Sequence, residues 1–264
     1  MRDLLQDIPI FYLGAIASLI AGLCTAVGAL PIFFVSHVSR RFQGILLGFG
    51  AGVMLAATSF SLIVPSIDYS KSQTGSTVLA AIIATIGMGI GGGFLWFSNQ
   101  YFPHEHFFKG REGRNIDHLK RIWLFVIAIA LHNFPEGLAV GVGFGGGDIN
   151  NGVALAIGIG LQNMPEGLVV ALALMTERYS RIAAFSIALV TGLVEPVGGA
   201  IGAGMVAIAQ SILPWGLAFA AGAMLFVISD EIIPESHRKG QEQEATLGVM
   251  AGFVVMMFLD ITLG

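Results

Sequence analysis

Apolar segments long enough to cross a lipid bilayer recur along the whole 264-residue chain. A transmembrane helix needs about 20 predominantly apolar residues. Strands of a membrane barrel would instead alternate apolar and polar residues over about 10 positions, and these segments do not. Hydrophobic residues make up 55% of the chain and charged residues only 11%, compared with roughly a quarter charged in a soluble domain. The sequence therefore predicts an all-α, polytopic membrane protein.

We predict eight transmembrane helices joined by short links, with one polar insert at residues 101–120. The links leave no room for a soluble domain, so residues 1–264 are expected to form a single transmembrane domain. The first segment is too long for the core of a signal peptide. Cys24 is the only cysteine, which excludes an intrachain disulfide. The predicted spans cover residues 8–34, 44–67, 77–100, 121–145, 151–175, 182–209, 212–233 and 245–263.

Basic residues are distributed unequally between the two sides of the membrane that eight spans define. Only Arg2 and Lys71 fall on the side of the two termini. Because cytoplasmic loops carry an excess of Lys and Arg, both termini are predicted to face the periplasm or exterior of a plasma or inner membrane. The insert 101–120 is then cytoplasmic. The cytoplasmic side holds Arg40, Arg41, Lys109, Arg111, Arg114, Lys120, Arg121, Arg178, Arg181, Arg238 and Lys239.

An internal repeat relates the second predicted span to the seventh. The pentapeptide Ala51-Gly52-Val53-Met54-Leu55 matches Ala221-Gly222-Ala223-Met224-Leu225, and the register continues through Ser59/Ser229, Ile63/Ile233 and Ser66/Ser236. The two spans run in opposite directions in the predicted topology. Inverted-topology transporters are built from such repeats, with their sites near the bilayer midplane. The alternative is that two helices rich in Gly, Ala and Met resemble each other by composition alone.

Two polar hexapeptides interrupt the fourth and fifth apolar segments. The first is His132-Asn133-Phe134-Pro135-Glu136-Gly137, and the second is Gln162-Asn163-Met164-Pro165-Glu166-Gly167. In each, the first residue and the glutamate are four apart, so on a helix they share one face. Both hexapeptides fall near the middle of their spans, at the depth predicted for Glu195 and Met54. Metal-binding residue types are thus expected to converge at one depth.

Glutamates at this depth need a compensating charge or a proton. An ionised carboxylate at the centre of a membrane helix costs at least ~2.5 kcal/mol on insertion scales, and no Lys or Arg lies at the same depth of these spans. Either the glutamates are protonated or a cation occupies the site. Imidazole, carboxylate and thioether groups suit zinc, and imidazole also accepts iron or nickel.

Three prolines accompany these glutamates. Pro135, Pro165 and Pro196 each remove a helix hydrogen bond, and carbonyls freed in this way are tolerated in a membrane only where protein or a polar cavity satisfies them. We therefore expect the helices to open where the ligands lie. The alternative is that the prolines are ordinary kinks of membrane helices.

The two hexapeptides make the chain resemble the ZIP (Zrt-/Irt-like) divalent metal transporter family, close to its bacterial branch. The resemblance covers the full chain. It implies a 3+2+3 helix bundle with a binuclear metal centre between the fourth and fifth spans. It also implies an elevator-type motion, in which spans one, four, five and six slide against the others.

The resemblance implies two adjacent metal sites that share Glu166. Many members have His at the position of Gln162 and some have Asp at that of Asn163, so fewer strong ligands are present here and zinc selectivity is expected to be weaker. The transport site is implied to comprise His132, Glu136, Gln162 and Glu166 with Met54, and the second site Asn133, Asn163, Glu195 and Glu166.

Further polar residues are candidates for the path to and from this site. On the outward side they are Ser61 and Asp68, with an exposed helix-end aspartate as the alternative for Asp68. Candidates for a cytoplasmic exit are Asp230, Glu231, Glu235 and His237. The insert adds His104, His106 and His118 as weak candidates, which can equally be solvated.

These residues are compatible with three functions. The favoured one is uptake of Zn2+, or of Cd2+, Fe2+ or Mn2+, into the cytoplasm. An intramembrane metal-dependent hydrolase is the alternative, but the midplane has one His and no HExxH helix, so no enzyme activity is expected. A proton path or scaffold with protonated glutamates is the third. The expected partners are divalent metal and the lipid bilayer but not nucleic acid, with no cofactor beyond the transported metal, Cd2+ as a surrogate for it, and a homodimer left open.

Overall fold

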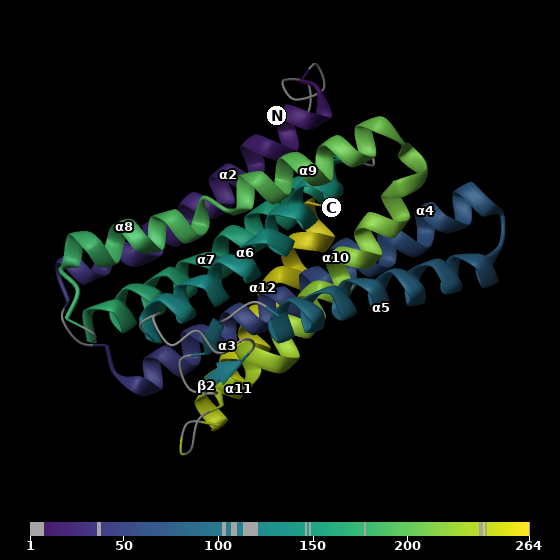
Figure 1. The fold of residues 1–264 in the computed structure, drawn as a ribbon. Coiled ribbons are helices and arrows are strands. Elements are labelled where there is room, and N and C mark those ends of the chain that lie inside the picture. Colours follow the sequence, from purple (N-terminus) through teal and green to yellow (C-terminus); the bar gives the residue numbers. More distant parts are fainter. Residues whose placement is uncertain are drawn as a thin grey trace.

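The computed structural model describes residues 8–35, 38–101, 104–106, 110–112, 121–145, 147, 149–176, 178–237, 240 and 242–263. In these residues the chain is almost entirely helical (Figure 1), which confirms the predicted polytopic α-helical class. Seven helical segments of this described part are long and apolar enough to cross a bilayer. They are Ile10–Phe33, Arg40–Thr74, Thr77–Ser98, Ile149–Thr176, Arg181–Ile208, Gln210–Ser236 and Glu242–Leu263.

The first half of the chain forms four helical segments and a short hairpin. The hairpin's two strands pair antiparallel and lie within the polar insert at residues 101–120. The elements are α2 (Ile10–Ala29) with the 3-10 turn η1 (Leu30–Phe33), α3 (Arg40–Ala56), the π-helical η2 (Ala57–Ile63), α4 (Val64–Thr74), α5 (Thr77–Tyr101), β1 (His104–His106), β2 (Gly110–Glu112) and α6 (Arg121–Gly145).

The second half adds the remaining helices. They are α7 (Ile149–Thr176), α8 (Arg181–Gly192), α9 (Glu195–Ile208), the 3-10 turn η3 (Gln210–Ile212), α10 (Leu213–Val227), the π-helical η4 (Ile228–Ile232), α11 (Ile233–Ser236) and α12 (Glu242–Leu263). Each predicted span corresponds to helix within a few residues, except that the second span is longer and the sixth is broken.

The second span continues to Thr74, seven residues beyond its predicted end. It stops where Gly75 adopts a left-handed conformation with φ of 66°, and the Gly75 N–H bonds the Lys71 carbonyl. Glycine tolerates this conformation without steric cost. Asp68 therefore lies inside a helix, and the predicted position at a helix end is wrong.

The sixth span is two helices rather than one kinked helix. Helix α8 ends at Gly192, and α9 begins at Glu195 with Pro196 in its first turn, where the missing N–H costs no hydrogen bond. Glu195 thereby stands at a helix N-terminus, where the helix dipole favours a carboxylate. Pro135 and Pro165, in contrast, lie inside continuous helices.

The two repeat-related spans share a backbone irregularity. Both change to π-helix just after the matched pentapeptides, in η2 and η4, and Ser59 and Ser229 occupy equivalent places in these segments. In each span a proline, Pro65 or Pro234, opens the helix that follows. Isolated π-helical turns are rare and often mark functional sites, and here one follows the matched pentapeptide in both spans.

The helices α2, α6, α7, α8 and α9 pack on one another, and we call them the α2 group. Among the other spans α3 packs against α12, and α10 packs against α4 and α5; we call these helices together the α10 group, although α3 and α12 also pack against α7. Glycines allow the closest approaches within each group. A methyl group at Gly137 of α6 would overlap the Glu195 carbonyl of α9, and one at Gly52 of α3 would overlap the Val249 carbonyl of α12. Small residues at such positions let membrane helices approach closely.

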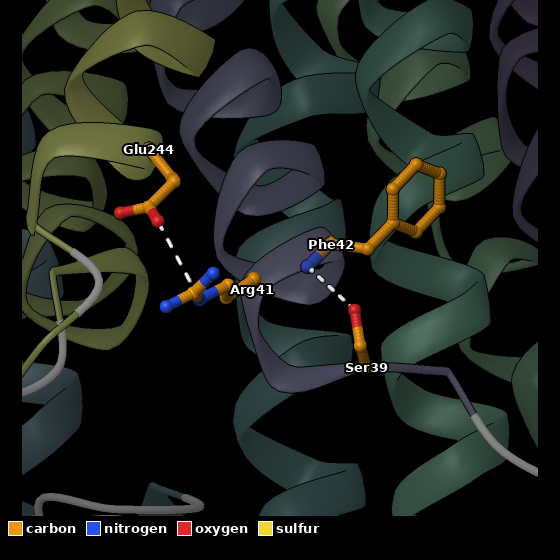
Figure 2. Close-up of polar contacts among 4 residues, drawn as sticks. All are labelled: Ser39, Arg41, Phe42 and Glu244. Atoms are coloured by element: carbon orange, nitrogen blue, oxygen red, sulfur yellow. Dashed lines mark hydrogen bonds and ion pairs between the residues drawn. The ribbon is translucent and has the colours of Figure 1, made fainter.

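Polar contacts stabilise the first turns of α3 and α12 at one end of the bundle. Figure 2 shows that the Ser39 hydroxyl accepts the Phe42 N–H at 3.2 Å and so caps α3, while Arg41 of α3 lies 3.6 Å from the Glu244 carboxylate of α12. The β1–β2 hairpin lies at this end in Figure 1, whereas the two chain ends and the α4–α5 turn lie toward the opposite end. The capped end carries several of the arginines that were predicted to be cytoplasmic.

Candidate metal-binding site

Nine buried polar or sulfur-containing side chains occupy the middle of the bundle. They come from five segments of the chain, and none exposes more than 8% of its surface. Such burial is expensive for carboxylates without a partner, so the contacts of each side chain determine what the site can do. The residues are Met54 on α3, His132, Asn133 and Glu136 on α6, Gln162, Asn163 and Glu166 on α7, Glu195 on α9, and Glu231 on η4.

His132 pairs with a residue from the opposite helix group. Its Nε2 atom lies 2.6 Å from Oε2 of Glu231, and both side chains are almost fully buried. The sequence placed Glu231 at the cytoplasmic exit of the seventh span. The structure instead places its carboxylate against His132, because the π-helical η4 lies deeper in the bundle than the end of the span.

The first residue of the second hexapeptide contacts the glutamate of the first. The Gln162 side-chain amide donates a hydrogen bond to Oε1 of Glu136 and lies 3.5 Å from Oδ1 of Asn163. This bond joins α6 to α7 at the position where the resemblance implies two metal ligands. The second Glu136 oxygen and the Gln162 oxygen have no hydrogen-bond partner among the described residues.

Asn163 connects three helices of the α2 group. Its side-chain amide donates to Oε1 of Glu195 at 2.7 Å and to the Ala21 carbonyl of α2 at 2.8 Å. One Glu195 oxygen is therefore satisfied by an amide and the other has no partner among the described residues. Asn133 is fully buried, and within the same described part neither its oxygen nor its nitrogen finds a partner. Among these donor atoms, the Asn163 amide is the one that contacts Glu195.

The carboxylates of the site repel one another. Glu136 interacts electrostatically with Glu166, and Glu195 with both of them. Glu166 is also within electrostatic range of Glu231 and Glu235, with His132 as a favourable partner. A concentration of negative charge in a low-dielectric region attracts a divalent cation. The donor set, with one imidazole, several carboxylates and amide oxygens, fits such an ion.

The side chains of the site bond to one another instead of forming a ready-made metal cage. Across the residues described by the structure, no three His, Cys, Asp or Glu side chains are arranged to hold one metal ion. The amides of Gln162 and Asn163 present their NH2 groups to carboxylates. A metal would have to replace these bonds. Met54 is 3% exposed on α3, whose Gly50 lies beside Gln162.

Near the C-terminal end of α12, Ser61 forms contacts that the sequence did not predict. Its hydroxyl donates to Oδ1 of Asp260 on α12 at 2.6 Å, and its carbonyl accepts from the Asn151 side chain of α7 at 3.3 Å. Sequence reasoning missed Asp260 because it lies within three residues of the predicted end of an apolar span and belongs to no motif. The sequence feature that could have identified Asp260 is its acidic side chain within an otherwise apolar predicted span.

The remaining path candidates are scattered. Glu235 of α11 is close enough to His132 and Glu166 to interact electrostatically, whereas Asp230 of η4 lines a separate cavity with Met88 of α5. The His237 ring lies 3.1 Å from Oγ1 of Thr246, so it ties α11 to α12. His104 and His106 are in β1, where the backbone pairs them with Glu112 and Gly110. His118 lies outside the described residues.

A cluster of ionisable side chains in the middle of a helical membrane protein marks the pathway of an ion or substrate, so fold and site together define the class of membrane transport proteins. Comparison with known proteins identifies the family within this class. The family model described as ZIP Zinc transporter matches residues 105–260. The chain belongs to the ZIP zinc transporter family, a family of transporters and not of enzymes.

Several bacterial relatives match nearly the whole chain. The zinc transporter GufA of Myxococcus xanthus is 48% identical over 251 residues, which cover 95% of this chain and 99% of the relative. The zinc transporter ZIPB of Bordetella bronchiseptica is 44% identical over 240 residues, covering 91% and 78%. The zinc transporter ZupT of Chlorobium phaeovibrioides is 35% identical over 258 residues, covering 93% and 96%. The resemblance drawn from the two hexapeptides, including the bacterial branch, is confirmed.

Proposed function

We propose that the protein carries Zn2+ from the periplasm or exterior into the cytoplasm through the buried site, and that Cd2+, Fe2+ and Mn2+ are weaker substrates. The observation that carries this proposal is the convergence of Glu136, Glu166 and Glu195 from three helices of a membrane protein. Repelling carboxylates in such surroundings are explained by a cation that occupies the site for part of the transport cycle. The relatives named as zinc transporters support the choice of metal.

The proposal includes eight spans with both termini outside. Helix α6 has 25 residues and coincides with the fourth predicted span, and with it the seven apolar segments become eight. An even number of spans agrees with the two chain ends lying toward one end of the bundle (Figure 1). The basic residues favour the other end as cytoplasmic.

Metal binding would exchange hydrogen bonds for coordinate bonds. If the Gln162 and Asn163 amides rotate by half a turn, their oxygens take the places that their NH2 groups now occupy beside Glu136 and Glu195. Amide oxygen then becomes a ligand together with the carboxylate. His132 would leave Glu231 so that a ring nitrogen can bind the metal. We infer two adjacent sites, of which the first uses His132 and the second Asn133, with Glu166 shared.

Glu231 gives His132 a partner whenever the metal is absent. Removing one member of a buried charged pair costs about 3–5 kcal/mol, so an unpaired His132 or Glu231 would be unfavourable after metal release. The pair therefore favours release toward the cytoplasmic side, where Glu235 continues the acidic path. Amide ligands, which are weaker than His or Asp, also favour release.

Alternating access would come from sliding the α2 group along the α10 group. The hexapeptides and Glu195 belong to the α2 group, whereas Met54, Ser61 and Glu231 belong to spans of the α10 group. The closest approaches of glycine to a neighbouring backbone lie inside each group, whereas Gly158 of α7 meets only side chains, those of Met256 and Val53, across the boundary. This difference favours motion of each group as a unit. On the outward side, the Asn151 to Ser61 hydrogen bond crosses the boundary and would break when the site opens outward.

Zinc uptake into proteoliposomes that contain a fluorescent zinc reporter tests the proposal. Replacing a metal ligand should lower uptake by about tenfold or more, so His132→Ala and Glu166→Ala should both be slow. Glu244→Gln is the control, because Glu244 pairs with the exposed Arg41 on the surface and should retain wild-type uptake. Unchanged uptake in both site variants would contradict the proposed site.

A further inference from the structure

An apolar groove runs along the boundary between the two helix groups. Its volume is about 420 Å³, no charged, hydroxyl or amide side chain is among its lining residues, and no polar atom faces it. Ile90 and Phe94 of α5 and Phe219 of α10 form one wall, and Phe134 and Leu138 of α6 with Met205 of α9 form the other. The α2 group and the α10 group thus contribute facing walls.

The groove opens to the surface of the protein at membrane depth. Ile90 is 55% exposed and Met205 is 43% exposed, although both line the groove. The helices α5, α9 and α10 belong to segments long and apolar enough to cross the bilayer. Hydrocarbon is the solvent at that depth. Water is a poor occupant because it needs two to four polar partners, and the lining offers none.

The inner end of the groove is part of the metal-site helix. Phe134, Leu138 and Val142 follow one another four residues apart on α6 and line the groove, a distance of about 12 Å along the helix. Phe134 lies inside the first hexapeptide, directly after Asn133 and before Pro135. Whatever fills the groove therefore contacts the same helical turn as the candidate metal ligands.

A second apolar groove differs from the groove at Phe134 because its lining comes from a single helix group. It measures about 340 Å³ and is lined by Ala17 and Cys24 of α2, Phe144 of α6 and Met164 of α7. All of these helices belong to the α2 group, so sliding between the groups would carry that groove along unchanged. The groove at Phe134 has walls from both groups and would change shape.

We propose that the groove at Phe134 is a binding site for one acyl chain of a membrane lipid. The chain lies between Ile90 and Met205 and reaches Phe134 with its methyl end. It contacts both helix groups in the present arrangement and must shift when they slide. The binding site stands independently of the proposed transport function, whereas its effect on the rate of transport rests on that function.

Photo-crosslinking in proteoliposomes tests the binding site without zinc. The probe is a phosphatidylglycerol that carries a diazirine near the end of one acyl chain, and cross-linked peptides are identified by mass spectrometry. Labelling at Phe134, Leu138 and Met205 should exceed labelling at Ile86 and Phe258 by about threefold or more, because a chain held in a groove stays in contact. Ile86 and Phe258 are exposed apolar residues outside the groove.

A matched pair of variants separates the groove from the general lipid surface. Ile90→Trp fills the groove, whereas Ile86→Trp adds the same side chain one turn away on α5, at a position that is 47% exposed. Ile90→Trp should lower labelling of Phe134 and Met205 by about threefold, and Ile86→Trp should leave it unchanged. Even labelling of all exposed apolar residues, an equal effect of both variants, or cross-linked dimers seated in the groove would overturn the proposal.

Zinc uptake by the same vesicles tests the coupling to transport. A filled groove should hinder sliding, so Ile90→Trp should lower the uptake rate by about threefold or more relative to Ile86→Trp. Equal rates would overturn the coupling and leave the lipid site in place. Absence of uptake in the wild type would contradict the proposed function, and the labelling result would still decide the lipid site.

Discussion

The imidazole of His132 on α6 lies 2.6 Å from the carboxylate of Glu231 on η4, and this contact joins the first hexapeptide to the helix group that faces it. The two residues are 99 positions apart in the sequence, and both are almost fully buried. Their pairing gives the candidate metal ligand an internal partner. It also extends the acidic region from Glu166 toward Glu235.

Removing the Glu231 carboxylate should destabilise the metal-free protein. Loss of one member of a buried charged pair costs about 3–5 kcal/mol, so Glu231→Ala should lower the temperature of unfolding in detergent more than Glu231→Gln, whose amide oxygen still accepts a hydrogen bond. Zinc uptake should fall in both. Glu244→Gln, at the exposed pair with Arg41, should change neither, since surface pairs contribute at most about 1 kcal/mol. Equal unfolding temperatures for Glu231→Ala and Glu244→Gln would rule out a supporting role for the pair.

Replacing Gln162 by a stronger ligand should tighten zinc binding and slow its release. Gln162→His exchanges an amide oxygen for an imidazole nitrogen, which zinc prefers, and an affinity gain of about tenfold corresponds to about 1.4 kcal/mol. Equilibrium dialysis with Zn2+ measures the affinity, and release into zinc-free buffer measures the rate.

Gln162→Leu is the matched control for this substitution, because it removes the amide and leaves Glu136 without its donor. Its zinc affinity should fall below that of the wild type. If both substitutions changed affinity in the same direction, Gln162 would not be a metal ligand.

Zinc binding should weaken as the pH falls from about 7.5 to 5.5. A metal binds neutral imidazole and ionised carboxylate, so protons compete with it, and the unperturbed pKa of histidine lies near 6.5, inside this range. Binding is therefore complete above the range and is lost on acidification. Titration of bound Zn2+ against pH measures the effect. His132→Gln should have a lower affinity and a shallower dependence, whereas a flat curve for the wild type would contradict competition at this site.

Close packing of α6 against α9 should not tolerate even a methyl group. Gly137→Ala would place its Cβ on the Glu195 carbonyl, whereas the Cβ of Gly93→Ala on α5 meets nothing within 4 Å. Overpacking costs about 1–3 kcal/mol, so Gly137→Ala should lower the unfolding temperature and Gly93→Ala should not. Zinc affinity should also fall in Gly137→Ala, because the shift moves Glu195 relative to Asn163. Equal stability of the two variants would show that α6 and α9 can separate without cost.

The spans and the hexapeptides were predictable because their signals are local. Helix length follows from apolar composition, and the spacing of His132 and Glu136 follows from helical periodicity. The end of the second span at Gly75 and the break before Glu195 also have local causes, a glycine and a proline, although the sequence alone did not show that Pro196 divides the span and does not merely kink it.

Contacts between distant helices were not predictable in this way. Glu231 was placed at an exit because its depth depends on the π-helical turn of η4, which no residue pattern specifies. Asp260 was missed because its partner Ser61 lies 199 residues away, and the pairing depends on the packing of α3 against α12. Which atoms of Gln162 and Asn163 face the carboxylates also depends on the assembled site.

In the proposed topology the Ser61–Asp260 hydrogen bond lies on the outward side of the site, so its removal should affect metal capture more than the transport step. Asp260 is the partly buried carboxylate that accepts the Ser61 hydroxyl at 2.6 Å, and the Asn151 side chain of the other helix group donates to the Ser61 carbonyl.

Asp260→Asn keeps the size of the side chain and removes the charge that attracts a cation. The KM for zinc uptake should therefore rise by about tenfold, which corresponds to about 1.4 kcal/mol, with little change in kcat. Thr262→Val is the control on the same helix, and its KM should stay at the wild-type value. Among the described residues, the Thr262 hydroxyl donates to the Phe258 and Leu259 carbonyls of its own helix. A fall in kcat at constant KM in Asp260→Asn would instead show that Asp260 acts on the rate of sliding, through Ser61 and its hydrogen bond to Asn151 of the other helix group, and not on capture.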